Sequence, residues 1–321
     1  MEPMLLRPAG KDYLWGGNRL KTEYGKDIEL MPIAETWECS THPDGLSIIT
    51  SGCYSGRTLK EVLRIHPEYL GRRMKDSAEL PILIKFIDAE KNLSVQVHPD
   101  DEYARLHENQ NGKTEMWYVL DAKEDTKIIY GFEHSMNRQL LQDSVEHGML
   151  DKHLRKVSIH KNDVFYIPAG MVHGIGAGAL IVEIQVSSNV TYRIWDFDRV
   201  GKDGKKRELH LKKAMDVMDM KAGSLLGRKP RMMEYFPGGS REILCRCRYF
   251  QVQRIMISRE YSLSVFEDSF QVLLCIEGSG KLKCESSGEF MHFQKGFCMF
   301  IPAGAGVCLI NGKASLLNVK C

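Results

Sequence analysis

Two imidazoles, one carboxylate and one amide in the first part of the chain are residue types that suit a metal ion. Gln96 and His98 lie two residues apart in NLSVQVHPDD, where the alternation of a β-strand turns both side chains to one face. Glu115 begins the run EMWYVLDA, and His173 ends the word IPAGMVH. These mixed nitrogen and oxygen donors suit zinc with a coordination position left for water or substrate, and iron or manganese would also fit. For Gln96 and His98 alone, the alternative is an exposed polar strand face.

Lys113 and Arg193 are further candidates for chemistry near this set. Lys113 precedes Glu115 by two residues, so both side chains of an extended chain point to the same side. A neighbouring metal ion would disfavour the ammonium form and make the amine available as an acid or base; a solvated loop lysine is the alternative. Arg193 lies in the strand-like run VTYRIWDF and needs a counter-anion, which is Asp196, Asp198 or a ligand phosphate.

Three other residues are candidates for lining a cavity. Trp15 precedes two glycines that would let the backbone approach a ligand, or else it anchors a core. Lys85 interrupts the apolar run PILIKFI, where a buried ammonium needs a partner. Glu183 shares one face of LIVEIQV with Gln185, and this face would line a cavity or a solvent-facing sheet edge. The basic stretch GKDGKKRE at 201–208 is expected to be a solvated turn, with a phosphate site as the alternative.

Short β-rich runs bounded by Gly, Pro, Asn or Asp dominate the chain and must position these residues. Helical periodicity is confined to 58–74, 100–109, 135–150 and 208–220. We therefore expect a mainly β fold of antiparallel strands with a few inserted helices.

A second β-rich block begins near Arg241 and repeats the word IPAG, which occurs at 167–170 and again at 301–304. Superposing the two words places Val307 where the first copy has His173. One copy would then bind a metal while the other is structural, with Val307 filling the space. Two ordinary β-turns are the alternative.

The composition excludes several classes of function. Lys plus Arg number 44 against 42 Asp plus Glu, and this net charge of +2 gives no field that would recruit nucleic acid or an acidic membrane. No apolar stretch approaches the roughly 20 residues that cross a bilayer, and the start shows no secretory signal, so we expect a cytoplasmic protein. The nine cysteines lack CxxC spacing and are expected to be buried free thiols of a reducing compartment.

The candidate ligands and the words around them resemble the type I mannose-6-phosphate isomerases (phosphomannose isomerases), in the compact bacterial form of this branch of the cupin superfamily. The shared words include YLWGG at Tyr13, AETWECSTHPDG at Ala34, GKTEMWYVLDA at Gly112 and TYRIWDFDR at Thr191. The usual cupin motif is H-x-H closely followed by Glu, whereas this chain has Gln96 for the first His and a helical segment before the Glu. Many family members carry His where this chain has Gly112.

The resemblance implies two cupin units, each a jelly-roll β-barrel. Residues 1–220 would form a catalytic unit with helical insertions, 221–240 a linker, and 241–321 a degenerate unit without metal ligands. It implies one Zn²⁺ per chain, held by Gln96, His98, Glu115 and His173. We expect a small sugar phosphate as partner, no nucleic acid or membrane partner, and a monomer or weak homo-oligomer.

The resemblance also implies the interconversion of mannose 6-phosphate and fructose 6-phosphate through a cis-enediol. Lys113 and Arg193 would be the catalytic residues, and Lys85, Trp15 and Glu183 would bind the substrate. The missing His at position 112 leaves the identity of the C1–C2 proton carrier open. The alternatives are a non-catalytic sugar-phosphate-binding cupin and a metal-dependent cupin oxygenase.

Overall fold

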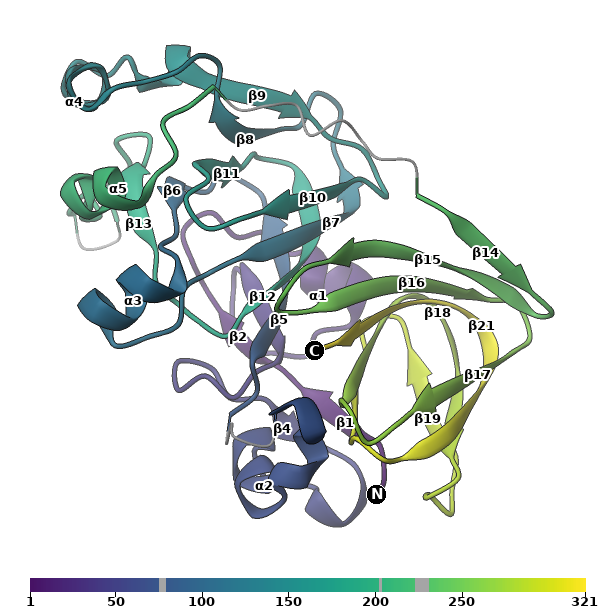
Figure 1. The fold of residues 1–321 in the computed structure, drawn as a ribbon. Helices are drawn as coiled ribbons and strands as arrows, with labels where there is room; N and C mark the ends of the chain where they lie inside the picture. The colour runs from purple at the N-terminus through teal and green to yellow at the C-terminus, as the bar shows by residue number, and fades with distance from the viewer. Residues whose placement is uncertain (75–78, 202–203, 223–230) are drawn as a thin grey trace.

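The computed structural model describes residues 1–74, 79–201, 204–222 and 231–321, whose strands form three antiparallel sheets of ten, six and five strands (Figure 1). The expected mainly β fold is confirmed. Among the described residues no sheet closes into a barrel. None of the helices in this part of the chain is long and apolar enough to cross a membrane.

Two sheets belong to the part of the chain that carries the candidate site. The six-stranded sheet has the order β10 (Val164–Ile167), β7 (Glu115–Ala122), β12 (Ala179–Val186), β5 (Ile82–Ala89), β3 (Glu35–Cys39) and β2 (Ala9–Lys11). The five-stranded sheet has the order β13 (Tyr192–Trp195), β6 (Val95–Val97), β11 (His173–Ile175), β8 (Lys127–Phe132) and β9 (Leu154–Ser158).

The ten-stranded sheet is built mainly from the end of the chain but also takes in two strands from its beginning. Its main path is β14 (Met233–Phe236), β15 (Gly239–Arg246), β16 (Gln251–Ile257), β21 (Gly306–Lys320), β18 (Gln271–Cys284), β20 (Cys298–Ile301), β1 (Met4–Arg7) and β4 (Ile48–Ile49). Two further strands join it, β17 (Glu260–Val265) on β21 and β19 (Met291–Gln294) on β18.

The helices are short and lie outside the sheets. The α-helices are α1 (Arg19–Tyr24), α2 (Leu59–Ile65), α3 (Asp101–Glu108), α4 (Arg138–Glu146) and α5 (Leu211–Val217). The 3-10 helices are η1 (Gly52–Tyr54), η2 (Pro67–Leu70), η3 (Arg72–Met74) and η4 (Leu150–His153). The four helical regions expected from periodicity contain α2 to α5, whereas the six residues of α1 carry too little periodicity to predict.

The six-stranded sheet is buried on both faces, which explains its nearly continuous apolar strands. On β12, Leu180 and Val182 pack in one core with residues of the ten-stranded sheet such as Leu274. On the opposite face, Ile181 packs with Ile175 of the five-stranded sheet. A polar side chain on this second face is therefore enclosed between the two sheets that carry the candidate ligands.

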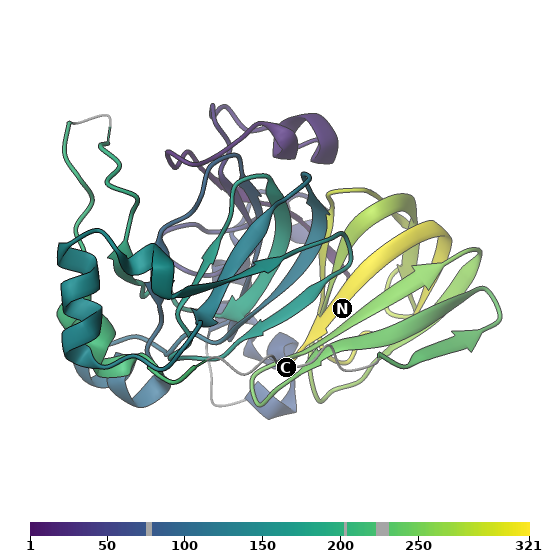
Figure 2. The same cartoon turned by 90° about the horizontal axis from the view of Figure 1, so that it is seen from above.

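Helices α4 and α5 cover the outer face of the five-stranded sheet. Leu141 of α4 and Ala214 of α5 share a core with Val97 and Ile194. Figures 1 and 2 show α4 on the side of the molecule away from the C-terminal strands. Since Val95 and Val97 face this outer core, the alternation of β6 turns Gln96 toward the inside.

The predicted linker at 221–240 lies only partly in the described chain. Residues 223–230 are outside the described residues, while the second part of the stretch forms β14 and begins β15. The N-terminal strand β1 pairs with β20, with Met4 opposite Phe300. Figure 1 shows the start of the chain against the C-terminal strands, so the two parts share one sheet.

The two IPAG words form similar turns in similar registers. Gly170 and Gly304 both have positive φ, 85° and 78°, which glycine adopts without strain. Val307 does not fill an interior space as expected, because 39% of its surface is exposed whereas His173 is buried. The inward position on β21 belongs to the next residue, Cys308, which is fully buried.

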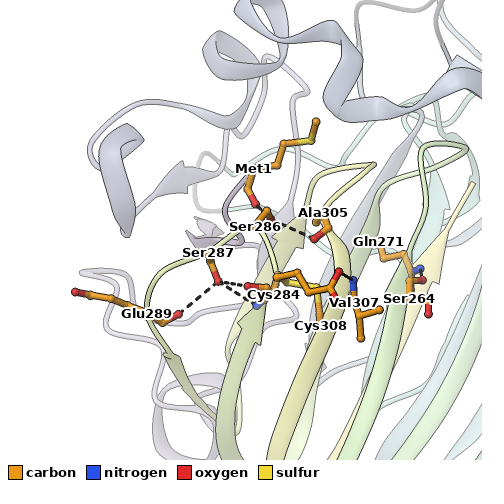
Figure 3. Close-up of a disulfide and its surroundings, with 11 residues drawn as sticks. Met1, Ser264, Gln271, Cys284, Ser286, Ser287, Glu289, Ala305, Val307 and Cys308 are labelled. Atoms are coloured by element: carbon orange, nitrogen blue, oxygen red, sulfur yellow. Dashed lines mark hydrogen bonds between the residues drawn. A yellow bond between two sulfur atoms is a disulfide. The ribbon is translucent and has the colours of Figure 1, made fainter.

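Cys284 and Cys308 form a disulfide, which corrects the expectation that all nine cysteines are free thiols (Figure 3). They lie opposite each other on β18 and β21, within the apolar core of the C-terminal strands. The sequence shows two apolar segments but not their register, so the pairing was not predicted. The other seven cysteines, all in the described chain, are free.

Candidate active site

Three buried side chains from three separate segments meet at the centre of the candidate site. Glu115 starts β7, His173 starts β11, and His98 follows β6. His173 Nε2 lies 3.1 Å from Glu115 Oε1, and His98 Nε2 lies 3.5 Å from the same oxygen. One ligand atom from each residue lies within 4.8 Å of the others, and no other such cluster of His, Cys, Asp or Glu occurs in the described chain.

Hydrogen bonds on the far side of each ring set the tautomers of the two imidazoles. His98 Nδ1 lies 2.8 Å from the carbonyl of Val190, and His173 Nδ1 lies 2.8 Å from the carbonyl of Met171. Each Nδ1–H therefore donates to a backbone carbonyl, and each Nε2 faces Glu115. Backbone carbonyls commonly orient metal-binding histidines in this way.

The residues present fit a metal ion. Both oxygens of Glu115 are buried without a hydrogen bond, and Oε2 forms an ion pair with the ammonium of Lys113. His173 Nε2 and Glu115 Oε1 lie 3.1 Å apart, so a cation placed between them would contact both atoms; the ammonium of Lys113 lies 3.0 Å from the other oxygen, Oε2. This donor set of two nitrogens and one carboxylate is typical of catalytic zinc.

Gln96 completes the set that the sequence predicts. Its Nε2 lies 3.4 Å from His173 Nε2, and its Oε1 accepts from Ser94 at 3.3 Å. A half-turn of the amide would exchange its nitrogen for its oxygen, the atom that binds metals. All four predicted ligands are therefore brought together.

Lys113 lies beside this cluster, as its spacing from Glu115 predicts. Its Nζ is 3.0 Å from Glu115 Oε2, 3.2 Å from His98 Nε2 and 3.9 Å from Glu183 Oε1. Burial and the charge of Lys113 lower the pKa of His98 to about 3. Although burial opposes it, the charge of Lys113 holds the pKa of Glu115 well below its usual range. The imidazole of His98 is thus neutral and the carboxylate of Glu115 charged, the forms that bind metals.

A cavity of about 280 Å³ adjoins the cluster, and every predicted site residue outside the cluster lines this cavity. Its lining includes Trp15, Lys85, Gln96, Lys113, Glu183 and Arg193. Trp15 fits both interpretations of the sequence. Its ring is buried in an apolar core, and it also lines the cavity. The solvent-edge alternative for Glu183 is wrong, because the side chain is enclosed.

The buried ammonium of Lys85 has the partners that its burial requires. Its Nζ lies 3.1 Å from Glu183 Oε1 and 3.6 Å from Glu35 Oε2. Burial favours the neutral amine, but the charges of Glu35 and Glu183 outweigh it and raise the pKa of Lys85. Burial and the nearby charge of Glu115 raise the pKa of Glu183, whose Oε2 accepts from Trp117 Nε1 at 3.0 Å.

Arg193 and Arg207 both line the cavity, and Arg193 lies opposite Gln96 in the sheet register. Asp196 forms ion pairs with Arg199 and Arg207. Arg193 donates to the carbonyl of Glu208 at 2.8 Å but pairs with no carboxylate among the described residues, and its Nε is buried without a partner. Burial and the charge of Arg207 lower the pKa of Arg193. The cavity therefore presents excess positive charge here.

Two of the lining residues were missed or misread in the sequence. Arg207 belongs to the basic stretch expected to be a solvated turn; residues 202–203 lie outside the described chain, but Arg207 lines the cavity, so that interpretation is wrong for it. Glu35 lies on the fully buried strand β3. The cue that the sequence offers for Glu35 is its position two residues before Trp37. In the structure, Trp37 Nε1 donates to Glu35 Oε2 at 2.8 Å.

Comparison with known proteins gives the family. Residues 4–130 match the model of the phosphomannose isomerase type I catalytic domain, and residues 241–321 match that of the mannose-6-phosphate isomerase cupin domain. The mannose-6-phosphate isomerase ManA of Bacillus subtilis is 38% identical over 318 residues, covering 98% of each chain. The chain belongs to the type I mannose-6-phosphate isomerases.

Other relatives agree with this assignment. A mannose-6-phosphate isomerase of Streptococcus mutans is 43% identical over 217 residues, 68% of each chain. The crystal structure of the Bacillus subtilis mannose 6-phosphate isomerase superposes with a TM-score of 0.89 at 32% identity, covering 99% of both chains. A zinc-bound mannose 6-phosphate isomerase has the same fold, with a TM-score of 0.78 at 15% identity. The chain is thus a mannose-6-phosphate isomerase.

Proposed function

We propose that this isomerase depends on zinc and interconverts D-mannose 6-phosphate and D-fructose 6-phosphate through a cis-enediol. One Zn²⁺ per chain would be held by Gln96, His98, Glu115 and His173. The observation that carries the proposal is the buried cluster of His98, Glu115 and His173, whose ligand atoms all lie within 4.8 Å of one another. The bound ion would supply a Lewis acid for the substrate oxygens.

Lys113 moves the proton between C1 and C2 in this proposal. Its amine lines the cavity and lies within 3.2 Å of two ligand side chains, so it faces the place where the reacting carbons would lie. Many family members carry a His at the position of Gly112 that would share this proton transfer, but Gly112 has no side chain to do so. Glu183 is the second candidate, because it faces the same cavity and burial raises its pKa.

Arg193 and Arg207 bind the phosphate. The guanidinium of Arg193 has no carboxylate partner among the described residues, and a phosphate oxygen would satisfy its buried Nε. Arg207 contributes charge while Asp196 holds it in place through the bond from Nε to Oδ2 at 2.8 Å. A phosphate dianion would balance the positive charge of these arginines.

Lys85, Glu183 and Trp15 contact the sugar. Lys85 offers a donor and Glu183 an acceptor to hydroxyl groups, while the ring of Trp15 supplies an apolar wall. Enclosure of these groups between two sheets keeps water away from the opened sugar. We also propose two cupin units, which the repeated registers support. A cytoplasmic location is proposed from the seven free thiols, although the Cys284–Cys308 disulfide is of a kind rare in reducing compartments.

The test is conversion of mannose 6-phosphate by the purified protein before and after metal removal. We expect turnover to disappear with a chelator and to return with zinc. Full turnover after verified metal removal would reject the role of the ion. Stabilisation by mannose 6-phosphate without any turnover would instead favour a sugar-phosphate-binding cupin.

A further inference from the structure

Asp101 links the segment that carries His98 to the segment that carries Lys113. It is the first residue of α3, three positions after His98. The amide of Gly112 donates to Asp101 Oδ1 at 3.0 Å, and the amide of Lys113 donates to the carbonyl of Pro99 at 3.0 Å. The chain around residue 113 is thus bound to the chain around residue 100 by two adjacent hydrogen bonds.

The approach of the two segments is close enough to require glycine at position 112. A Cβ atom on Gly112 would lie 2.3 Å from the carbonyl carbon of Asp100 and 2.4 Å from the nitrogen of Asp101, both backbone atoms. This gives a physical reason for the departure from the family's His: a side chain here would push the two segments apart. The backbone before Lys113 therefore rests directly on the start of α3.

The second oxygen of Asp101 is held by the C-terminal unit, residues 241–321. Tyr249 Oη donates to Asp101 Oδ2 at 2.9 Å, and Arg248 Nη2 donates to the same oxygen at 3.0 Å. The guanidinium of Arg248 also lies over the ring of Tyr249, 4.6 Å from its centroid. Burial and the bond to Asp101 raise the pKa of Tyr249 to about 12, so the phenol keeps its proton and donates.

These contacts give the C-terminal unit a place in the reaction although it carries none of the proposed ligands. We propose that Asp101 is a positioning residue that fixes Lys113 beside the ligand cluster, and that Tyr249 and Arg248 of the C-terminal unit hold Asp101 for this purpose. The inference rests on the proposed role of Lys113. Its physical basis is that a shift of about 1 Å in a reacting group can cost about 100-fold in rate.

The test compares Asp101→Ala, Tyr249→Phe and Arg248→Ala in the full-length, zinc-loaded enzyme. We expect kcat to fall about 10- to 100-fold for Asp101→Ala and about 3- to 10-fold for each of the others, with KM and zinc content unchanged. The deuterium isotope effect on kcat for mannose 6-phosphate labelled at C2 should rise, because proton transfer becomes slower than the other steps. The Asp101→Ala/Tyr249→Phe double variant should match Asp101→Ala.

Arg246→Ala is the matched control, because Arg246 lies two residues earlier and bonds to Gln251. It should leave kcat and the isotope effect unchanged. The proposal is overturned if kcat of Asp101→Ala stays within twofold of the wild type, or if the isotope effect stays constant while thermal stability or zinc content falls. Should Asp101→Ala fail to fold, Tyr249→Phe removes one hydroxyl only, and an unchanged kcat there overturns the proposal too.

Lys113→Met, measured in parallel, separates the two levels of inference. Loss of turnover in Lys113→Met together with normal turnover in Asp101→Ala overturns the positioning role alone. Normal turnover in Lys113→Met overturns the proton role of Lys113, and with it the reason for positioning.

Discussion

Gln271 occupies in the second repeat the register position that Glu115 occupies in the first. Glu115 pairs with Ile167 of one IPAG word, and Gln271 pairs with Ile301 of the other. The surroundings differ: Gln271 Nε2 donates to the carbonyl of Ser264 at 2.9 Å, and Figure 3 shows the two residues side by side. Asn318 Nδ2 donates to Gln271 Oε1 at 2.7 Å, so both ends of the amide are bonded, whereas Glu115 faces two imidazoles and the ammonium of Lys113.

Gln271→Glu tests this difference. The carboxylate would face the carbonyl of Ser264 without a proton to donate, so we expect the free energy of unfolding to fall by about 1–3 kcal/mol. The positions equivalent to Gln96 and His173 hold Ser264 and Val307, neither of which offers an imidazole, so the zinc content should stay at one ion per chain. Urea unfolding and elemental analysis measure both quantities. A second bound ion would contradict the structural role of this repeat.

Arg193→Lys should lower kcat about 100-fold and leave the zinc content unchanged. A lysine keeps the charge but cannot reproduce the planar fork that binds phosphate through two bonds. Arg57→Lys, at an exposed position of the same unit, is the control. Normal turnover of Arg193→Lys with mannose 6-phosphate would show that the arginine only stabilises the fold.

Removing the disulfide should affect stability and not catalysis. The Cys284→Ala/Cys308→Ala double variant loses a cross-link between residues 24 apart, which by loop closure is worth about 3 kcal/mol of unfolding free energy. Cys275→Ala, which removes a free thiol from the same core, is the control for lost packing. A reductant should lower the melting temperature of the wild type but not that of the double variant. A drop in kcat on reduction would contradict a purely structural bond.

The stability of the metal-free protein should fall in mild acid. Burial and Lys113 lower the pKa of His98 from 6.5 to about 3, so below pH 6.5 the unfolded chain binds a proton that the folded chain does not. The unfolding free energy of chelator-treated protein should therefore decrease as the pH falls from 6.5 toward 3. His98→Gln should show a smaller decrease over the same range. Equal pH dependence in both proteins would mean that His98 is not the group responsible.

The sequence predicted side chains whose position follows from local alternation. Gln96 faces the site because Val95 and Val97 face an apolar core. Lys113 points to the same side as Glu115 because the two residues are two positions apart on an extended chain. The sequence does not show the long-range register of strands. The disulfide between Cys284 and Cys308 depends on how two long strands pair, and the predicted inward residue, Val307, is one position before the inward residue of the structure. Arg207 looked like a solvated residue because its partner Asp196 lies in another segment.

The most direct measurement is zinc titration of chelator-treated protein with turnover of mannose 6-phosphate as the readout. We predict that turnover rises in proportion to added zinc and levels off at one ion per chain. His173→Ala should neither bind zinc nor regain turnover, whereas Val307→Ala should bind zinc and regain turnover. Full turnover of metal-free protein, or equal loss of zinc from both variants, would contradict the central claim that four side chains of the first repeat hold the catalytic ion.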